Sequence, residues 1–245
     1  MKLDAIVIVA IAVTTASCSF RGSLPGRPSQ GSEVARPEMV MEFSSLYRSN
    51  CAGCHGSEGS GGAAVSLADP IYLAIADNDV IRKAASNGVP GTAMPAFARQ
   101  SGGMLTNEQI EALVVGIRSR WAKPDILRGT RPPPYSDPEP GDPQRGAEVY
   151  GVYCDSCHGA EGRGGDQAGS IVDDSYLALV SDQGLRTTVI VGRPELGAPD
   201  WRHNAPGKVM TDEDITDVVS WLVSQRKQVP GQPYPTPPIT MGAAP

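Results

Sequence analysis

Apolar residues recur at helical spacing in four segments of the chain. Two of these segments, 38–50 and 144–153, lead directly into cysteine motifs. The other two follow Thr106 and Thr211 and carry stripes of Ile, Val and Leu. A period near 3.6 residues predicts amphipathic helices, and no segment shows a clear strand pattern. The hydrophobic pattern therefore predicts an all-α fold.

Capping sequences mark where the two later helices begin. Residues 106–109 read Thr-Asn-Glu-Gln, a capping box in which hydroxyl and amide side chains satisfy each other's backbone N–H groups. Residues 211–214 read Thr-Asp-Glu-Asp, an acidic variant of the same box. We expect helices to start directly after Thr106 and Thr211.

The chain contains an internal duplication. Adding 103 to the numbers of segment 55–62 gives segment 158–165, which repeats its pattern of His, Gly and Glu. Beyond Asp69 the offset becomes 104, and Asp69 corresponds to Asp173. Self-similarity of this kind predicts two copies of one domain, over residues 38–123 and 144–228. Between them, 124–143 holds seven prolines and predicts an extended linker, while 229–245 is a Pro-rich tail.

The same pentapeptide pattern, Cys-x-x-Cys-His, heads both copies, at 51–55 and 154–158. Two thiols one helical turn apart can each bond a vinyl group of a porphyrin, and the next residue offers an imidazole to the iron. A zinc site or a redox disulfide is the alternative, but neither explains why a His follows both cysteine pairs. We expect two covalently bound haem c groups. Their predicted protein ligands are Cys51, Cys54, Cys154 and Cys157 as thioethers and His55 and His158 on the irons.

The N-terminal segment, residues 1–17, reads as a signal peptide. Lys2 precedes an apolar run over 5–13, which is too short to span a bilayer, and small residues precede Cys18. The position of Cys18 resembles a bacterial lipoprotein processing site, although Thr15 stands where a large aliphatic residue is usual. Lipidation of Cys18 and a free thiol are the two alternatives. Residues 18–37 predict a flexible tether, and we expect a periplasmic or cell-envelope protein anchored to the membrane by lipid.

The order of motifs resembles that of class I c-type cytochromes in nearly all of both domains. Helix, attachment motif, Gly-rich loop, ligand loop and closing helix follow one another twice. The resemblance implies that the first and last helices cross, with an aromatic residue of the last helix at the crossing. Trp221 fits that role in the second domain, whereas Gly116 stands at the matching place in the first. It also implies a backbone carbonyl, near a proline such as Pro70, that orients the ring of the iron-bound His.

The sixth iron ligand is where the two copies differ. The segment 91–97 looks like the family's Met-Pro loop, which implies that Met94 is a ligand; packing in the core is the alternative. At the corresponding place the second copy has Ala198, which cannot bind iron. His203, Met210 and an open position remain as alternatives there.

The chemistry predicted for the chain is a relay of single electrons, as a tethered carrier or as a subunit of a larger complex. A ligand-binding or peroxidase-like second haem, fed by the first, is the rival interpretation. The sequence shows no catalytic residues of another kind, so we expect an electron-transfer protein and not an enzyme. The formal net charge of -6 argues against nucleic-acid binding. Expected partners are redox proteins, among them a membrane respiratory complex, with the donor and acceptor unspecified.

Overall fold

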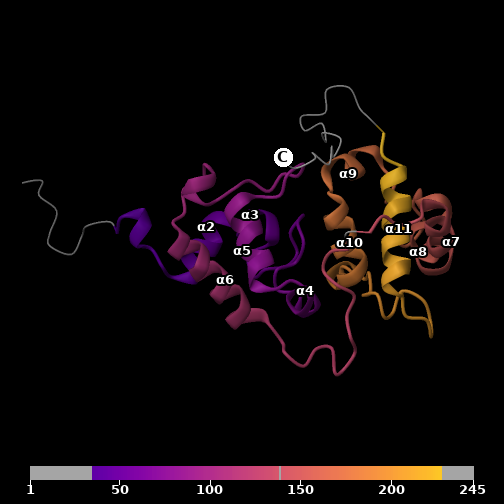
Figure 1. Ribbon diagram of the computed structural model, residues 1–245, viewed down its shortest axis with the longest axis horizontal. Helices are drawn as coiled ribbons and strands as arrows, with labels where there is room; N and C mark the ends of the chain where they lie inside the picture. The colour runs from indigo at the N-terminus through magenta and orange to yellow at the C-terminus, as the bar shows by residue number, and fades with distance from the viewer. Residues whose placement is uncertain (1–34, 138, 228–245) are drawn as a thin grey trace, which may run out of the picture. The chain divides into compact units, whose positions relative to one another are not determined.

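The computed structural model describes residues 35–137 and 139–227, and within these ranges it contains helices and isolated bridges but no strands. The all-α prediction is confirmed. Cys18, the predicted signal peptide and the Pro-rich tail lie outside the described residues. The elements of the first domain are η2 (Pro37–Met39), α2 (Phe43–Asn50), α3 (Ala52–His55), α4 (Pro70–Ile75), α5 (Asn78–Asn87), η3 (Arg99–Ser101) and α6 (Asn107–Trp121) (Figure 1).

The second domain repeats the order of the α-helices and adds a 3-10 turn, η4, after the attachment helix. Its elements are α7 (Pro143–Tyr153), α8 (Asp155–His158), η4 (Ala160–Gly162), α9 (Asp174–Leu179), α10 (Asp182–Val191), η5 (Pro194–Leu196) and α11 (Asp212–Ser224). Each copy therefore has an entry helix, a one-turn attachment helix, two short helices, a 3-10 turn and a closing helix. The structural repeat follows the duplication in the sequence. None of the helices that the structure describes is long and apolar enough to cross a membrane.

Both predicted capping boxes are present. The hydroxyl of Thr106 accepts from the N–H of Gln109 at 3.3 Å, and the Gln109 amide oxygen accepts from the N–H of Thr106 at 3.0 Å. Thr211 and Asp214 exchange the corresponding bonds at 3.1 and 2.9 Å. Because these bonds satisfy N–H groups that have no partner inside the helix, α6 and α11 begin directly after Thr106 and Thr211.

The prediction of one helix over residues 38–50 is wrong in its start. A 3-10 turn ends at Met39, and α2 begins only at Phe43. The carboxylate of Glu42 accepts from the N–H groups of Ser44 and Ser45 at 2.8 and 2.7 Å. That side chain caps the helix, and Glu42 itself has an extended backbone.

Sequence reasoning missed the two middle helices of each domain. Asp69 caps α4 by accepting from the N–H groups of Ile71 and Tyr72 at 2.7 and 2.9 Å. Asp173 does the same for α9 in the second domain. The Asp-Pro pair at 69–70 was the available signal, because Pro is favoured at the first helical position behind a capping residue.

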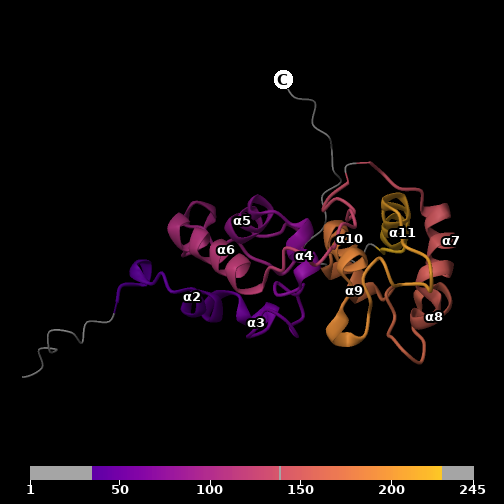
Figure 2. The ribbon, with the colours of Figure 1, turned by 90° about the horizontal axis from the view of Figure 1, so that it is seen from below.

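In the second domain the first and last helices pack closely, and α7 and α11 lie side by side in both views (Figures 1 and 2). Gly146 lies against α11 so closely that a Cβ there would lie 2.1 Å from the carbonyl oxygen of Asp217. Trp221 stacks on Tyr150 with ring centroids 4.5 Å apart. The expected aromatic residue at the crossing is therefore Trp221.

The first domain uses different residues at this crossing. Gly116 of α6 receives the ring of Phe43, because a Cβ on Gly116 would lie 2.0 Å from Phe43 Cδ2. The indole of Trp121 meets Phe43 and Tyr47 edge-on, with centroids 5.7 and 5.1 Å apart. A Cβ on Gly59 would lie 2.8 Å from the Trp121 ring, and one on the equivalent Gly162 would lie 3.4 Å from the Trp221 ring. Trp121, five positions after Gly116, thus takes the place of Trp221.

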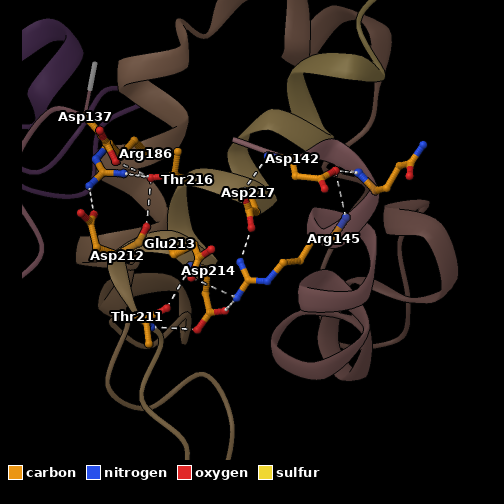
Figure 3. A network of polar contacts seen from close by, with 11 residues as sticks. Asp137, Asp142, Arg145, Arg186, Thr211, Asp212, Glu213, Asp214, Thr216 and Asp217 are labelled. Carbon is orange, nitrogen blue, oxygen red and sulfur yellow. Dashed lines mark hydrogen bonds and ion pairs between the residues drawn. The ribbon is translucent and has the colours of Figure 1, made fainter. Parts of the chain in front are cut away.

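The Pro-rich linker is not extended throughout. Its first part forms turns, with the N–H of Ile126 bonded to Lys123 O at 3.1 Å and that of Arg128 to Asp125 O at 3.1 Å. Its second part binds the second domain through Arg186, a buried side chain of α10. The guanidinium donates to Pro134 O at 3.0 and 3.2 Å and to the Thr216 hydroxyl at 2.9 Å. Figure 3 shows Arg186 beside Thr216 and Asp212 at the acidic start of α11, with the linker residue Asp137 bonded to the Thr216 hydroxyl.

Candidate haem-binding sites

Each attachment motif forms a single helical turn at the end of the entry helix. The N–H of Cys51 donates to Tyr47 O at 2.8 Å, which closes α2. The N–H groups of Cys54 and His55 then both donate to Cys51 O, at 3.2 and 3.0 Å. In the second domain Cys157 and His158 donate to Cys154 O at the same two distances. One turn therefore holds two thiols and an imidazole together in each copy.

A backbone carbonyl orients each of the two motif histidines. Nδ1 of His55 lies 2.8 Å from Val65 O, and Nδ1 of His158 lies 2.9 Å from Gly169 O. Because a carbonyl oxygen only accepts, Nδ1 carries the proton, and Nε2 keeps the lone pair that a metal ligand needs. As the resemblance implied, the acceptor is a carbonyl in the loop after the attachment motif. It is not next to Pro70, which occupies the first turn of α4 behind the capping Asp69.

A tyrosine of the entry helix supports the residue after each histidine. The hydroxyl of Tyr47 donates to Gly56 O at 3.0 Å, and that of Tyr150 donates to Gly159 O at 2.5 Å. The two pairs are related by the offset of 103 that relates the motifs. These bonds connect the attachment turn to the aromatic cluster at the helix crossing, so they limit how far the motif can move.

Burial favours the neutral forms of the predicted ligands. His55 is 7% exposed, and burial lowers its pKa below the ordinary value, against the opposing effect of the Val65 carbonyl. Burial also raises the pKa of Cys51 to about 11 and that of Cys154 to about 12. An uncharged imidazole is the form that binds a metal. The donor set of each motif therefore fits haem c: two thiols for the vinyl groups and one imidazole, oriented through Nδ1 by a carbonyl, for the iron.

A glycine with a positive φ precedes the ligand loop in each domain. Gly88 ends α5 with a φ of 70°, and a Cβ there would lie 2.7 Å from Met94 O. Gly192 ends α10 with a φ of 73°, and a Cβ there would lie 2.7 Å from Ala198 O. Both backbones need a glycine, because a side chain would be strained at this φ and would overlap the loop. Ala198 thus stands where Met94 stands in the first domain.

The other two candidates for the sixth position have partners of their own. Nδ1 of His203 lies 3.2 Å from Asp200 Oδ1, and the His203 side chain is 66% exposed. Met210 is 2% exposed, and its sulfur accepts from Asn204 Nδ2 at 3.3 Å. Residues 35–137 and 139–227 bring together no group of three or more His, Cys, Asp or Glu side chains that could hold a metal ion.

The chain matches a family model described as "Cytochrome C oxidase, cbb3-type, subunit III" over residues 38–115 and again over 141–222, which is well over half of the chain. Each match overlaps one of the two copies of the repeat. A family match of this extent shows membership of the family.

Curated relatives are cbb3-type cytochrome c oxidase subunits. FixP of Sinorhizobium medicae is 29% identical over 152 residues, which are 56% of this chain and 46% of that protein. FixP of Rhizobium meliloti is 28% identical over 201 residues, which are 73% of this chain and 62% of that protein. This chain therefore spans about half to three fifths of the length of the curated relatives it matches.

A solved structure, the Kuenenia stuttgartiensis reducing HAO-like protein complex Kustc0457/Kustc0458, aligns with 76% of this chain and 96% of its own. The TM-score is 0.42 and the sequence identity 18%, values too low to support a conclusion. The family match and the twofold attachment geometry carry the assignment instead. The chain belongs to the family of cbb3-type cytochrome c oxidase subunit III and is a class I c-type cytochrome with two covalently bound haem c groups.

Proposed function

We propose that the chain relays single electrons between redox partners in a cell-envelope respiratory chain. The observation that carries the proposal is the twofold repetition of one attachment geometry, in which a carbonyl holds Nδ1 of the motif histidine 2.8 Å away in the first domain and 2.9 Å away in the second. An imidazole held in this way would keep its orientation toward a bound iron. A fixed ligand geometry suits electron transfer because little has to rearrange.

Our assignment of the haem ligands follows the two motifs. Cys51 and Cys54 would bind the first haem and Cys154 and Cys157 the second, with His55 and His158 on the irons. Bound haem c supplies an iron that alternates between the ferric and ferrous states. Met94 would complete the first site, and its backbone N–H donates to the Thr92 hydroxyl at 3.2 Å, which supports the loop.

The proposed partner is a membrane respiratory oxidase. Its basis is that the curated relatives are named subunits of cbb3-type cytochrome c oxidases. We propose that a lipid on Cys18 tethers the chain in the periplasm, either as a subunit of such a complex or as a carrier beside it. Co-purification of the oxidase with the full chain from detergent-solubilised membranes would support the first form. Mass spectrometry of the mature N-terminus would test the lipid.

Haem counting tests the attachment sites. We expect the C51A/C54A variant and the C154A/C157A variant each to lose the mass of one haem, and the wild type to carry two. C18A is the matched control, because it removes a cysteine outside both motifs and should keep both haems. Retention of two covalent haems by either double variant would contradict the assignment.

Potentiometric titration of the same proteins tests electron transfer. We expect the wild type to show two one-electron transitions and each double variant to show one. The transition that survives identifies the domain from which it comes. If the wild type takes up fewer electrons than it has haems, the relay proposal fails.

A further inference from the structure

The ligand loop of the second domain keeps its backbone anchors but lacks an iron-binding side chain. The N–H of Trp201 donates to Ile190 O at 3.1 Å, as the N–H of Phe97 donates to Ala85 O at 3.1 Å in the first domain. At the far end of the loop, Met210 donates to Trp201 O at 3.0 Å, and Leu105 to Phe97 O at 2.8 Å. Under the offset of 104 that pairs Phe97 with Trp201, the acceptor in the second domain lies one position further along its helix. Both loops are nevertheless anchored to the preceding helix, and position 198 presents a methyl group where position 94 presents a thioether.

Met210 cannot replace Met94 without loss of structure around it. It occupies the place of Leu105, and the two side chains are 2% and 7% exposed. Its backbone is bonded to Trp201, and its sulfur accepts from Asn204 Nδ2 at 3.3 Å. The next residue, Thr211, caps α11. Bringing the Met210 sulfur to an iron would break its bond to Asn204 and would withdraw a side chain that is 2% exposed from the core next to the start of the closing helix.

His203 belongs to a closed turn that begins at Asp200. Its N–H donates to Asp200 O at 2.9 Å, and its Nδ1 lies 3.2 Å from Asp200 Oδ1. The Asp200 carboxylate also binds Arg202, whose Nε and Nη2 lie 3.0 and 2.9 Å from its two oxygens. Trp201, only 1% exposed, anchors the turn in the core. The imidazole of His203 is therefore tied through Nδ1 to a carboxylate that Arg202 also holds, and the His203 side chain is 66% exposed.

From these contacts we infer that the second domain supplies no sixth ligand to its haem iron and forms a binding site for a small diatomic molecule. The inference rests on the proposed attachment of a haem at Cys154, Cys157 and His158. Bound haem would supply a ferrous iron able to take neutral diatomic ligands such as carbon monoxide. The first domain, with Met94 in its loop, would not share this property.

Carbon monoxide titration of the fully reduced, full-length protein tests the inference. We expect one molecule to bind per two haems in the wild type. A198M should lose this binding and gain the sulfur-to-iron charge-transfer band of a thioether-ligated ferric haem. M94A is the matched change in the first domain, and it should raise the stoichiometry to two. H203A and M210L should keep the wild-type stoichiometry, and M210L preserves the volume of the buried side chain.

Electron paramagnetic resonance of the oxidised proteins gives a readout that does not depend on the added gas. We expect one high-spin and one low-spin ferric haem in the wild type and in H203A and M210L, because one iron lacks a strong sixth ligand. This measurement keeps the inference testable if A198M fails to fold.

Three results would overturn the inference. They are two low-spin haems in the wild type, binding of carbon monoxide that appears only after H203A, or binding that appears only after M210L. Haem counting and redox titration show whether only the diatomic binding site is refuted or the proposed electron relay as well. Two attached and reducible haems without carbon monoxide binding would remove the diatomic site alone, whereas a second domain without haem would remove both.

Discussion

Arg145 in α7 binds Asp214 in α11, with Nη2 and Oδ1 2.7 Å apart, and the same guanidinium pairs with Asp217 one turn further along (Figure 3). The carboxylates are 12% and 6% exposed, whereas the arginine is 37% exposed. Asp217 also accepts from the N–H of Asp142 at 2.7 Å, and Asp142 caps α7. One arginine therefore connects the start of the entry helix to the closing helix of the second domain.

Replacing Arg145 by methionine should destabilise the second domain by more than the loss of an exposed ion pair does. The change leaves two largely buried carboxylates without their cation, and the partial exposure of Arg145 reduces the cost below that of a fully buried pair. Urea denaturation of the holoprotein measures the effect. R163M is the control, because Arg163 pairs with Glu161 where both side chains are about three-quarters exposed, and it should change stability by less than about 0.5 kcal/mol. Equal effects of the two changes would contradict this account.

Replacing Gly116 by alanine should destabilise the first domain by about 1–3 kcal/mol, since the new methyl group would overlap the ring of Phe43. G151A is the matched control, because Gly151 also lies in a helix but has open space around it. That change should stabilise the second domain by about 0.5–1 kcal/mol through the higher helix propensity of alanine. Thermal unfolding followed by near-ultraviolet circular dichroism compares the two. If G116A left the thermal stability of the first domain unchanged, the aromatic packing at this crossing would be loose.

Replacing Met94 by histidine should lower the potential of the first haem, because a thioether ligand favours ferrous iron more than an imidazole does. The change should be on the order of 0.1 V, within the range of about 0.8 V that axial ligands span. The potential of the second haem should stay unchanged. M104L is the control, since Met104 is 80% exposed and has no expected contact with iron. If M94H leaves both potentials where they are, Met94 is not a ligand.

The cap of α2 predicts a pH dependence. The N–H groups of Ser44 and Ser45 lower the pKa of Glu42 from 4.5 to about 2. Because the folded-state pKa is depressed, the cap stabilises the fold fully above pH 4.5, and this contribution is lost as the pH falls from 4.5 toward 2. E42A should therefore unfold at lower urea concentration than the wild type at pH 7, and the difference should shrink across that interval. If the stability difference between E42A and the wild type stayed the same down to pH 2, the charge of the Glu42 carboxylate would not be its cause.

Several features were predictable because they depend on residues close together in the chain. The cysteine motifs, the capping boxes at Thr106 and Thr211 and the helical stripes behind them are local patterns, and the structure contains each helix that they predict. The repeat offset also paired Met94 with Ala198, and the glycines at 88 and 192 place these two residues at the same point of their loops. Local spacing carried these predictions because helix geometry has a fixed period.

The contacts that complete each site could not be read in the same way, because their partners are distant in sequence or interchangeable in type. Any backbone carbonyl could have oriented His55, and the fold selects Val65. The crossing in the first domain could have been filled from several positions, and the fold brings Trp121 and Phe43 there.

By itself the sequence determined that the chain has two all-α copies of one domain, each with an attachment motif, and that the second copy lacks the methionine of the first. Only the tertiary structure decided where the remaining candidates lie, with His203 exposed beside Asp200 and Met210 buried beside Asn204. The physical reason is that sequence states which side chains are chemically able to bind iron, whereas packing and hydrogen bonds decide which of them already have a partner.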